Sequence, residues 1–167
     1  AGYYRDYGDT HHVERTLTEG FAYQGETSAH RKGQSRGETS SHLPPTAFVN
    51  FIQNHDQIGN RPLGERLTTL CAAEPLAAAL AVLLLQPSPP LLFMGEEWGE
   101  TRPFCFFTDF HGELGDAVRE GRRREFRHWS GFRDAATRDL IPDPNALTTF
   151  EASKLDWGRA ETEEARG

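Results

Sequence analysis

The chain has 167 residues, of which 37% are apolar and 26% charged, and its formal net charge is −7. A domain of about 150 residues buries roughly 70% of its unfolded surface, so one hydrophobic core is expected. The acidic balance argues against a nucleic-acid-binding protein, which normally presents a basic face. No apolar run approaches the ~20 residues that span a bilayer, so no membrane association is expected.

The two cysteines are Cys71 and Cys105. Their separation matches neither a disulfide framework nor a CxxC metal motif, which predicts two reduced thiols in a cytoplasmic protein. The chain does not begin with methionine, and it ends in a charged stretch from Glu161 to Gly167. We therefore expect a piece of a longer polypeptide.

The first quarter of the chain predicts one short helix and one long loop. The helix is expected over 11–21, with Asp9 or Thr10 as its cap, because apolar residues recur every four positions. Residues 25–45 are poor in apolar side chains and rich in Ser, Thr, Gly, Arg and His. They predict an exposed loop, which is either an active-site lid or an excursion without function.

The middle of the chain predicts a strand, a helical crossover and a second strand. Thr46–Gln53 and Leu91–Met94 are short and almost continuously apolar, as in parallel strands that are buried on both faces. Helices are expected over Leu63–Leu70 and Pro75–Leu85, the second so apolar that neighbours must bury it. The pattern predicts an α/β fold, in which ligands bind beyond the carboxyl ends of the strands. Two strands cannot close a barrel, which again indicates a fragment or an obligate partner.

The last third predicts one further helix. Gly115–Trp129 has helical character, Ile141–Pro144 is a turn-rich linker, and Thr148–Trp157 is expected to be irregular. Three consecutive arginines, Arg122 to Arg124, could suggest a phosphate or RNA site. Because acidic residues flank them and the net charge is negative, a solvated or salt-bridged helix face is the favoured interpretation.

Polar residues that could perform chemistry follow each predicted strand. Asn54, His55 and Asp56 follow the first predicted strand. The imidazole of His55 and the carboxylate of Asp56 can bind sugar hydroxyls, and the carboxylate can also stabilise an oxocarbenium-like transition state. The alternative interpretation is a helix-capping aspartate beside a surface histidine. Catalytic zinc is disfavoured, since the histidines do not show the i, i+4 spacing of a helical zinc pair.

After the second predicted strand come Glu96, Glu97 and Trp98. Adjacent residues on an extended chain point in opposite directions, so at most one of the two carboxylates enters a shared site. The indole of Trp98 could stack on a sugar ring, or it could simply pack at the rim of the site.

The string Phe51–Arg61 resembles the fourth signature region of the α-amylase superfamily of glycoside hydrolases. Its extended form, with Gln57 and Gly59–Arg61, is similar in particular to the trehalohydrolases that act on maltooligosyl trehalose. The resemblance continues through Pro90–Trp98, Phe106–Asp109, Gly121–Phe126, Ile141–Pro144, Thr149–Phe150 and Lys154–Trp157.

This resemblance implies the last strands and helices of a (β/α)8 barrel over residues 1–140, with a linker and the start of a following segment over 141–167. It implies a cytoplasmic, retaining hydrolase of an α-glucan substrate that needs no metal or organic cofactor. Asp56 corresponds to the aspartate that stabilises the transition state. The substrate-binding residues that we expect beside it are His55, Asn54, Gln57, Arg61, Glu97 and Trp98.

Two catalytic carboxylates of the superfamily have no counterpart in the chain. The nucleophile lies in a Gly-x-Arg-x-Asp string, whereas the nearest string here, Gly131–Ala135, ends in alanine. No strand followed by a glutamate precedes residue 46. We therefore expect the chain alone to be inactive and to require the N-terminal part of the same barrel. A branching enzyme or amylase, and an inactive sugar-binding module, remain as alternatives.

Overall fold

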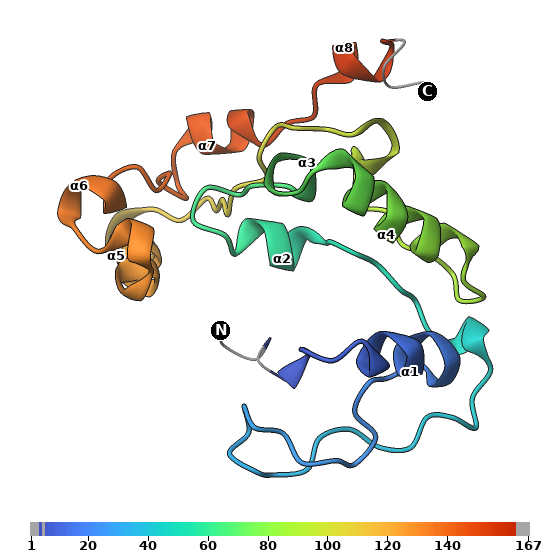
Figure 1. Cartoon of the computed structure of the whole chain (residues 1–167). Coiled ribbons are helices and arrows are strands. Elements are labelled where there is room, and N and C mark those ends of the chain that lie inside the picture. The colour runs from blue at the N-terminus through green and yellow to red at the C-terminus, as the bar shows by residue number, and fades with distance from the viewer. Residues whose placement is uncertain (1–3, 5, 163–167) are drawn as a thin grey trace. The chain divides into compact units, whose positions relative to one another are not determined.

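The computed structural model describes residue 4 and residues 6–162 (Figure 1). Contacts divide the chain into two units. Unit 1 contains the residues up to Phe51 together with Leu80–Leu91, and unit 2 contains Ile52–Ala79 and the residues from Leu92 onward. The helical elements are α1 (His11–Glu19), η2 (Pro45–Ala47), α2 (His55–Gly59), α3 (Leu67–Leu70), α4 (Ala73–Leu85), η3 (Glu96–Trp98), α5 (Gly112–Glu125), η4 (Phe126–His128), η5 (Ser130–Phe132), α6 (Ala135–Arg138), α7 (Leu147–Ala152) and α8 (Trp157–Ala160).

Helix α1 confirms the first predicted helix and ends two residues earlier than expected. The carboxylate of Asp9 accepts the backbone N–H of His11 at 2.9 Å, while Thr10 makes no side-chain cap bond. Gly20 ends the helix with a φ of 92°, and a Cβ at this position would lie 2.2 Å from the ring of Phe48. Glycine therefore permits both the turn and the approach of this ring.

The two predicted strands are much reduced in the structure. The segment expected over Thr46–Gln53 begins as the 3-10 turn η2, and it pairs only at Asn50, in a single parallel bridge with Pro90. The bridge uses Asn50 N–H to Pro89 O at 3.1 Å and Leu91 N–H to Asn50 O at 2.8 Å. The direction of pairing is therefore parallel, as expected.

Within the described residues, these strands and the apolar helix are not buried on all sides, so the neighbours that the sequence requires are not among those residues. Val49 and Phe51 are exposed, and along the apolar helix α4 only Leu83 is buried, whereas Val82 and Leu85 are exposed. The described part of the chain supplies no further strand or helix layer to cover these side chains. None of the described helices has the length and apolar character that crossing a membrane requires.

Unit 2 has an aromatic and aliphatic core. A series of edge-to-face contacts, with ring centroids 5.2 to 5.7 Å apart, connects Phe93, Phe104, Phe107 and Phe150 in that order. Ile58 and Phe126 are almost completely buried. Such ring pairs contribute about 0.5–1.5 kcal/mol each beyond the area that they bury.

The last third departs from the expectation in two places. The predicted basic helix is confirmed as α5, which begins three residues earlier than expected. Thr148–Trp157, expected to be irregular, instead contains all of α7 except its first residue, together with the first residue of α8. Both helices are too short for periodicity to be recognised. The turn at 141–144 is packed, because Ile141 is buried and the Pro144 carbonyl accepts the N–H of Thr108 at 2.7 Å. Both cysteines are free thiols, as predicted.

Candidate functional site

Helix α2 presents the first group of candidate residues and begins at a local signal. Asn54 is extended, and its side-chain oxygen accepts the backbone N–H of Gln57 at 2.9 Å. This is the usual role of asparagine at a helix N-cap. The capping residue is therefore Asn54, not Asp56, and the carboxylate of Asp56 is not used to hold the helix.

His55 and Asp56 point away from the body of unit 2. Their side chains are 70% and 76% exposed, and His55 Nε2 lies 3.5 Å from Asp56 Oδ1. Later in the same helix, Ile58 is fully buried and Gly59 is buried. The helix is thus anchored by Ile58 and offers an imidazole and a carboxylate to any ligand that approaches from solvent.

Gln53, which precedes this group, is a buried connector that the sequence did not single out. Its Nε2 donates to Glu96 Oε1 at 2.8 Å, and its Oε1 accepts the N–H of Leu67 at 3.2 Å. Glu96 also accepts the N–H of Phe93 at 2.6 Å. These bonds join the segment before α2 to the turn that carries the second group of candidate residues.

The two adjacent glutamates have different surroundings. Glu96 accepts hydrogen bonds from Gln53 and Phe93. Glu97 is exposed, and among the described residues it accepts only the N–H of Gly95, at 2.9 Å. Gly95 has a φ of 90°, and a Cβ there would lie 2.6 Å from Glu100 Cβ. Of the two, Glu97 is the glutamate that remains accessible to a ligand.

The buried side chain of Arg66 forms hydrogen bonds to the backbone on both sides of η3. It is 1% exposed and donates from Nε to Arg102 O at 2.7 Å and from Nη1 to Met94 O at 2.8 Å. Its guanidinium lies over the ring of Phe93, 5.1 Å from the centroid. Burial lowers the pKa of Arg66, and the negative charge of Glu100 opposes that effect. The position of Glu97 and Trp98 therefore depends on a residue about 30 positions away in the sequence.

Glu100 completes this buried polar cluster. Burial disfavours its charged form, but backbone N–H groups of Arg102, Asp156 and Thr101 hold its pKa below the ordinary value. Their distances to the carboxylate are 2.7 to 2.8 Å. A carboxylate with three backbone donors stays ionised in the interior. We assign Glu100 a role in shaping the turn.

Arg122 secures the other end of α2. Its side chain is 6% exposed, and Nη2 donates to the carbonyls of Gly59 at 2.5 Å and Arg61 at 3.0 Å. The guanidinium also lies over the rings of Phe106 and Phe126, and burial lowers its pKa. Arg122 also forms an ion pair with Glu125 at 2.9 Å, which confirms the predicted salt-bridged face, but Arg122 is buried and not solvated because α5 packs with this position inward.

The remaining candidate residues are less directly available. Gln57 turns its side-chain oxygen into the interior, where it has no partner among the described residues. Arg61 Nη1 donates to Glu65 O at 2.5 Å. Trp98 packs against Trp157 with ring centroids 5.3 Å apart, and its Nε1 is buried. Within the described residues, no hydrogen bond or ion pair joins His55 or Asp56 to Glu97 or Trp98.

The chemistry that this arrangement supports is sugar binding and electrostatic stabilisation. Asp56 and Glu97 are accessible carboxylates, and His55 adds a donor or acceptor for hydroxyl groups. Glycoside cleavage also requires a nucleophile or base together with an acid, held in register across the scissile bond. No group of three or more His, Cys, Asp or Glu side chains in the described part of the chain could hold a metal ion.

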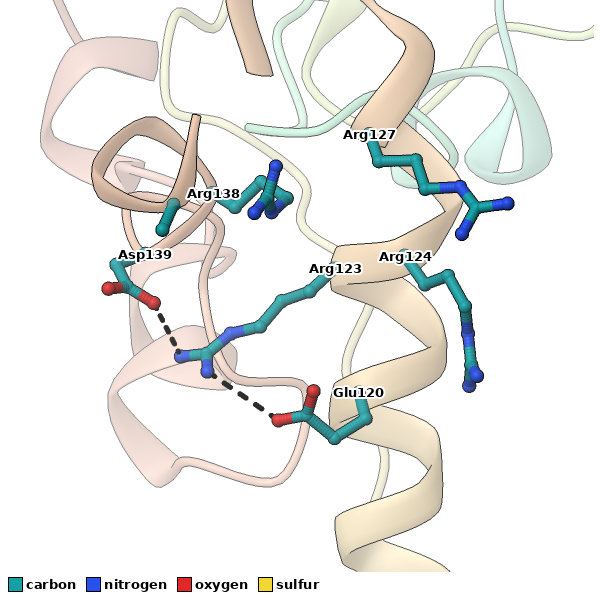
Figure 2. A pocket seen from close by; sticks show the side chains of 7 residues that line it. Glu120, Arg123, Arg124, Arg127, Arg138 and Asp139 are labelled. Atoms are coloured by element: carbon teal, nitrogen blue, oxygen red, sulfur yellow. Dashed lines mark ion pairs between the residues drawn. The ribbon is translucent and has the colours of Figure 1, made fainter. Parts of the chain in front are cut away.

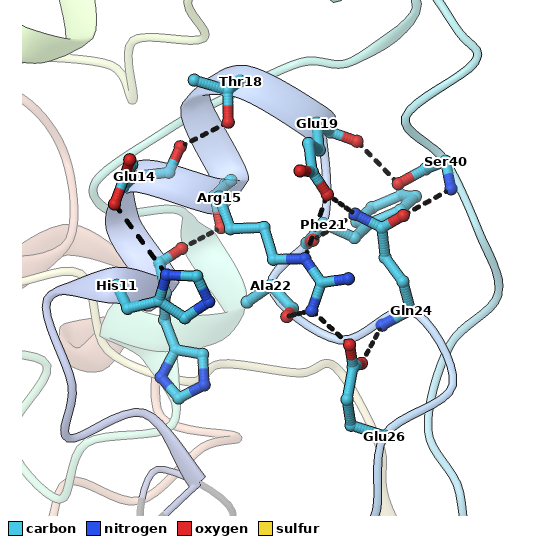
Figure 3. A network of polar contacts seen from close by, with 12 residues as sticks. His11, Glu14, Arg15, Thr18, Glu19, Phe21, Ala22, Gln24, Glu26 and Ser40 are labelled. Carbon is cyan, nitrogen blue, oxygen red and sulfur yellow. Dashed lines mark hydrogen bonds and ion pairs between the residues drawn. The ribbon is translucent and has the colours of Figure 1, made fainter.

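The loop predicted over 25–45 is ordered by a polar network in unit 1 (Figure 3). Arg15 on α1 contacts Glu19 at 3.0 Å and also forms an ion pair with Glu26. Gln24 donates to Glu19 at 2.7 Å, and Ser40 donates its hydroxyl to the carbonyl of Glu19 at 2.6 Å. Both ends of the loop are therefore attached to the end of α1.

We expect the attachment at Glu26 to weaken in acid. The backbone N–H of Gln24 and the guanidinium of Arg15 lower the pKa of Glu26 from 4.5 to about 2. A lowered folded-state pKa means that this contribution to stability is complete above about 4.5 and is lost as pH falls towards about 2. A carboxyl-detected NMR titration should give a pKa near 2 for Glu26. Arg15→Met should raise it, and Arg31→Met, an exposed arginine of the same loop, should not. An unchanged pKa in Arg15→Met would contradict the assignment.

Comparison with known proteins extends over almost the whole chain. No protein-family model matches it. It is 46% identical over 163 residues to a malto-oligosyltrehalose trehalohydrolase of Deinococcus radiodurans, covering 96% of this chain and 26% of that protein. Corresponding enzymes of Arthrobacter ramosus and Saccharolobus solfataricus are 38% and 40% identical, with 100% and 93% of this chain and 28% and 26% of those proteins covered.

A solved structure also matches the fold over almost the whole chain. A crystal structure of a Salmonella typhimurium protein, provisionally assigned as an α-amylase, superposes with a TM-score of 0.90 at 54% identity. The match covers 99% of this chain and 27% of that one. The chain therefore spans about a quarter of the length of the proteins that it matches. Over that quarter, the chain is similar to malto-oligosyltrehalose trehalohydrolases and to a protein assigned as an α-amylase.

Proposed function

We propose that the chain is a segment of a retaining glycoside hydrolase that cleaves the α-1,4 bond beside the terminal trehalose unit of maltooligosyl trehalose. The observation that carries this proposal is the 36–46% identity to trehalohydrolases, which extends over at least 93% of the chain. The accessible His55 and Asp56 at the start of α2 are consistent with it. In this function, Asp56 stabilises the oxocarbenium-like transition state and His55 binds a sugar hydroxyl.

The proposal also concerns architecture. The extended segments at Asn50 and Pro90 are two parallel strands of a (β/α)8 barrel, followed at about residue 141 by the next segment of the protein. The residues after 162 in that segment lie outside the described residues. The exposed apolar side chains of Val49, Phe51 and Leu85 support this view, since further strands and helices of a barrel would cover them.

The remainder of the same polypeptide would supply the nucleophile and the acid. We infer this because the Gly-x-Arg-x-Asp string of the nucleophile is absent and no predicted strand followed by a glutamate precedes residue 46. Asn54, Gln57, Arg61, Glu97 and Trp98 are proposed to surround the substrate. Of these, Glu97 is the best placed, because it is exposed and only lightly engaged.

One experiment distinguishes the proposed function from two alternatives. A branching enzyme of the same superfamily would transfer glucan branches, and a sugar-binding module would turn over nothing. We expect the full-length protein to release free trehalose from maltooligosyl trehalose, and the isolated 167 residues to release none. Chromatographic product analysis measures both. Turnover by the isolated chain would overturn the proposal that catalytic groups lie elsewhere, and branched products would overturn the proposed reaction.

A further inference from the structure

One cavity of unit 2 contains none of the residues to which the proposed sugar chemistry is assigned. It lies between α5 with the turn η4 and the short helix α6, and it has a volume of about 590 Å³ (Figure 2). Cavities of about 300–1,000 Å³ are typical of small-molecule sites. Its charged lining consists of Arg123, Arg124, Arg127, Arg138, Glu120 and Asp139. Four guanidinium groups are thus combined with two carboxylates, in a chain whose net charge is −7.

Two of the arginines are held in place by the protein. Arg123 extends between Glu120, at 3.7 Å, and Asp139, at 3.6 Å, and its Nε is buried without a partner among the described residues (Figure 2). Arg138 donates from Nη1 to the carbonyl of Arg133 at 2.6 Å. Their positions are therefore set before any ligand binds, which reduces the entropy that binding must overcome.

The other two arginines carry charge that nearby carboxylates do not neutralise. Arg124 and Arg127 are exposed, and neither forms an ion pair with a carboxylate among the described residues. Arg127 Nε lies 3.0 Å from His128 Nε2, which adds no negative charge. The charged lining of the cavity therefore has an excess of positive charge.

We propose that this cavity binds a small ligand that carries a phosphate group. Phosphate presents several acceptor oxygens and about two negative charges, which the planar arginine fork can bind through paired hydrogen bonds. The two carboxylates in the lining and the acidic chain as a whole would repel an extended polyanion such as RNA. The ligand is consequently either free phosphate or the phosphate of a small sugar monoester.

Calorimetric titration of the full-length protein tests this proposal, with inorganic phosphate, glucose 6-phosphate and glucose at constant ionic strength. Phosphate and the sugar phosphate should bind, and glucose should not bind to this cavity. Tighter binding of glucose 6-phosphate identifies a sugar monoester as the ligand, and equal binding identifies free phosphate. The double variant Arg124→Gln/Arg127→Gln should weaken binding by on the order of tenfold or more. Arg102→Gln, an exposed arginine elsewhere in unit 2, should leave it unchanged.

A second variant tests the role of the held arginine. Glu120→Gln removes one carboxylate from Arg123 and should strengthen phosphate binding several-fold. Glu113→Gln, an exposed glutamate on the same helix outside the cavity, controls for the general change in charge. If phosphate does not bind, or if the double variant and Arg102→Gln bind it equally, the proposal is wrong. Equal strengthening by Glu120→Gln and Glu113→Gln would also overturn it.

Discussion

Replacing Asp56 by asparagine in the full-length protein should reduce trehalose release by on the order of 10²–10³-fold or more. Asparagine keeps the shape of the side chain and removes the charge that would stabilise a positively charged transition state. The fold should be unaffected, because the Asp56 side chain is 76% exposed and helix α2 is capped by Asn54. Steady-state kinetics should therefore show the loss mainly in kcat, with an unchanged thermal unfolding temperature.

Asp116→Asn is the matched control for this experiment. Its side chain is 70% exposed, comparable to that of Asp56, and it lies on α5, where it pairs with Arg119. We expect a near-normal rate in this variant. A near-normal rate in Asp56→Asn would refute the role proposed for Asp56, and a low rate caused by unfolding would appear as a lowered melting temperature.

Replacing Arg122 by methionine should have the largest effect on stability. The change removes two charge-assisted hydrogen bonds to the carbonyls of Gly59 and Arg61, which are 2.5 and 3.0 Å from Nη2. Hydrogen bonds to charged groups contribute about 1.5–3 kcal/mol each. Methionine packs well between the rings of Phe106 and Phe126, which offsets part of the loss. The expected decrease in the free energy of unfolding is about 2–4 kcal/mol.

Urea unfolding of the full-length protein measures this decrease. Arg124→Met is the matched control, because Arg124 lies on the same helix and is exposed. Surface substitutions of this kind usually change the free energy of unfolding by less than about 0.5 kcal/mol. Equal unfolding midpoints for the two variants would show that Arg122 does not hold α2. Trehalose release should also fall in Arg122→Met, since α2 carries Asp56.

The elements that the sequence predicted well are those whose structure follows from residues close together in the sequence. Helix α1 follows from apolar residues at intervals of four, α5 from its polar helical composition, and the loop after α1 from the loss of apolar side chains. The short helices α7 and α8 were missed, because four to six residues are too few to show a period. The two strands were overestimated, since an apolar run indicates a strand but not whether partners are present to pair with it.

The sequence by itself indicated the resemblance to trehalohydrolases, the position of His55 and Asp56 beyond an extended apolar segment, and the acidic character of the chain. All of these are properties of contiguous residues or of composition. Only the tertiary structure decided that Gln53, Arg66 and Arg122 support the candidate site, that Glu97 is more accessible than Glu96, and that arginines of α5, η4 and α6 line one cavity. These contacts join residues from 14 to 63 positions apart, and such separations leave no periodic signal in a single sequence. Hydrogen bonds made by buried polar groups therefore had to be observed in the fold.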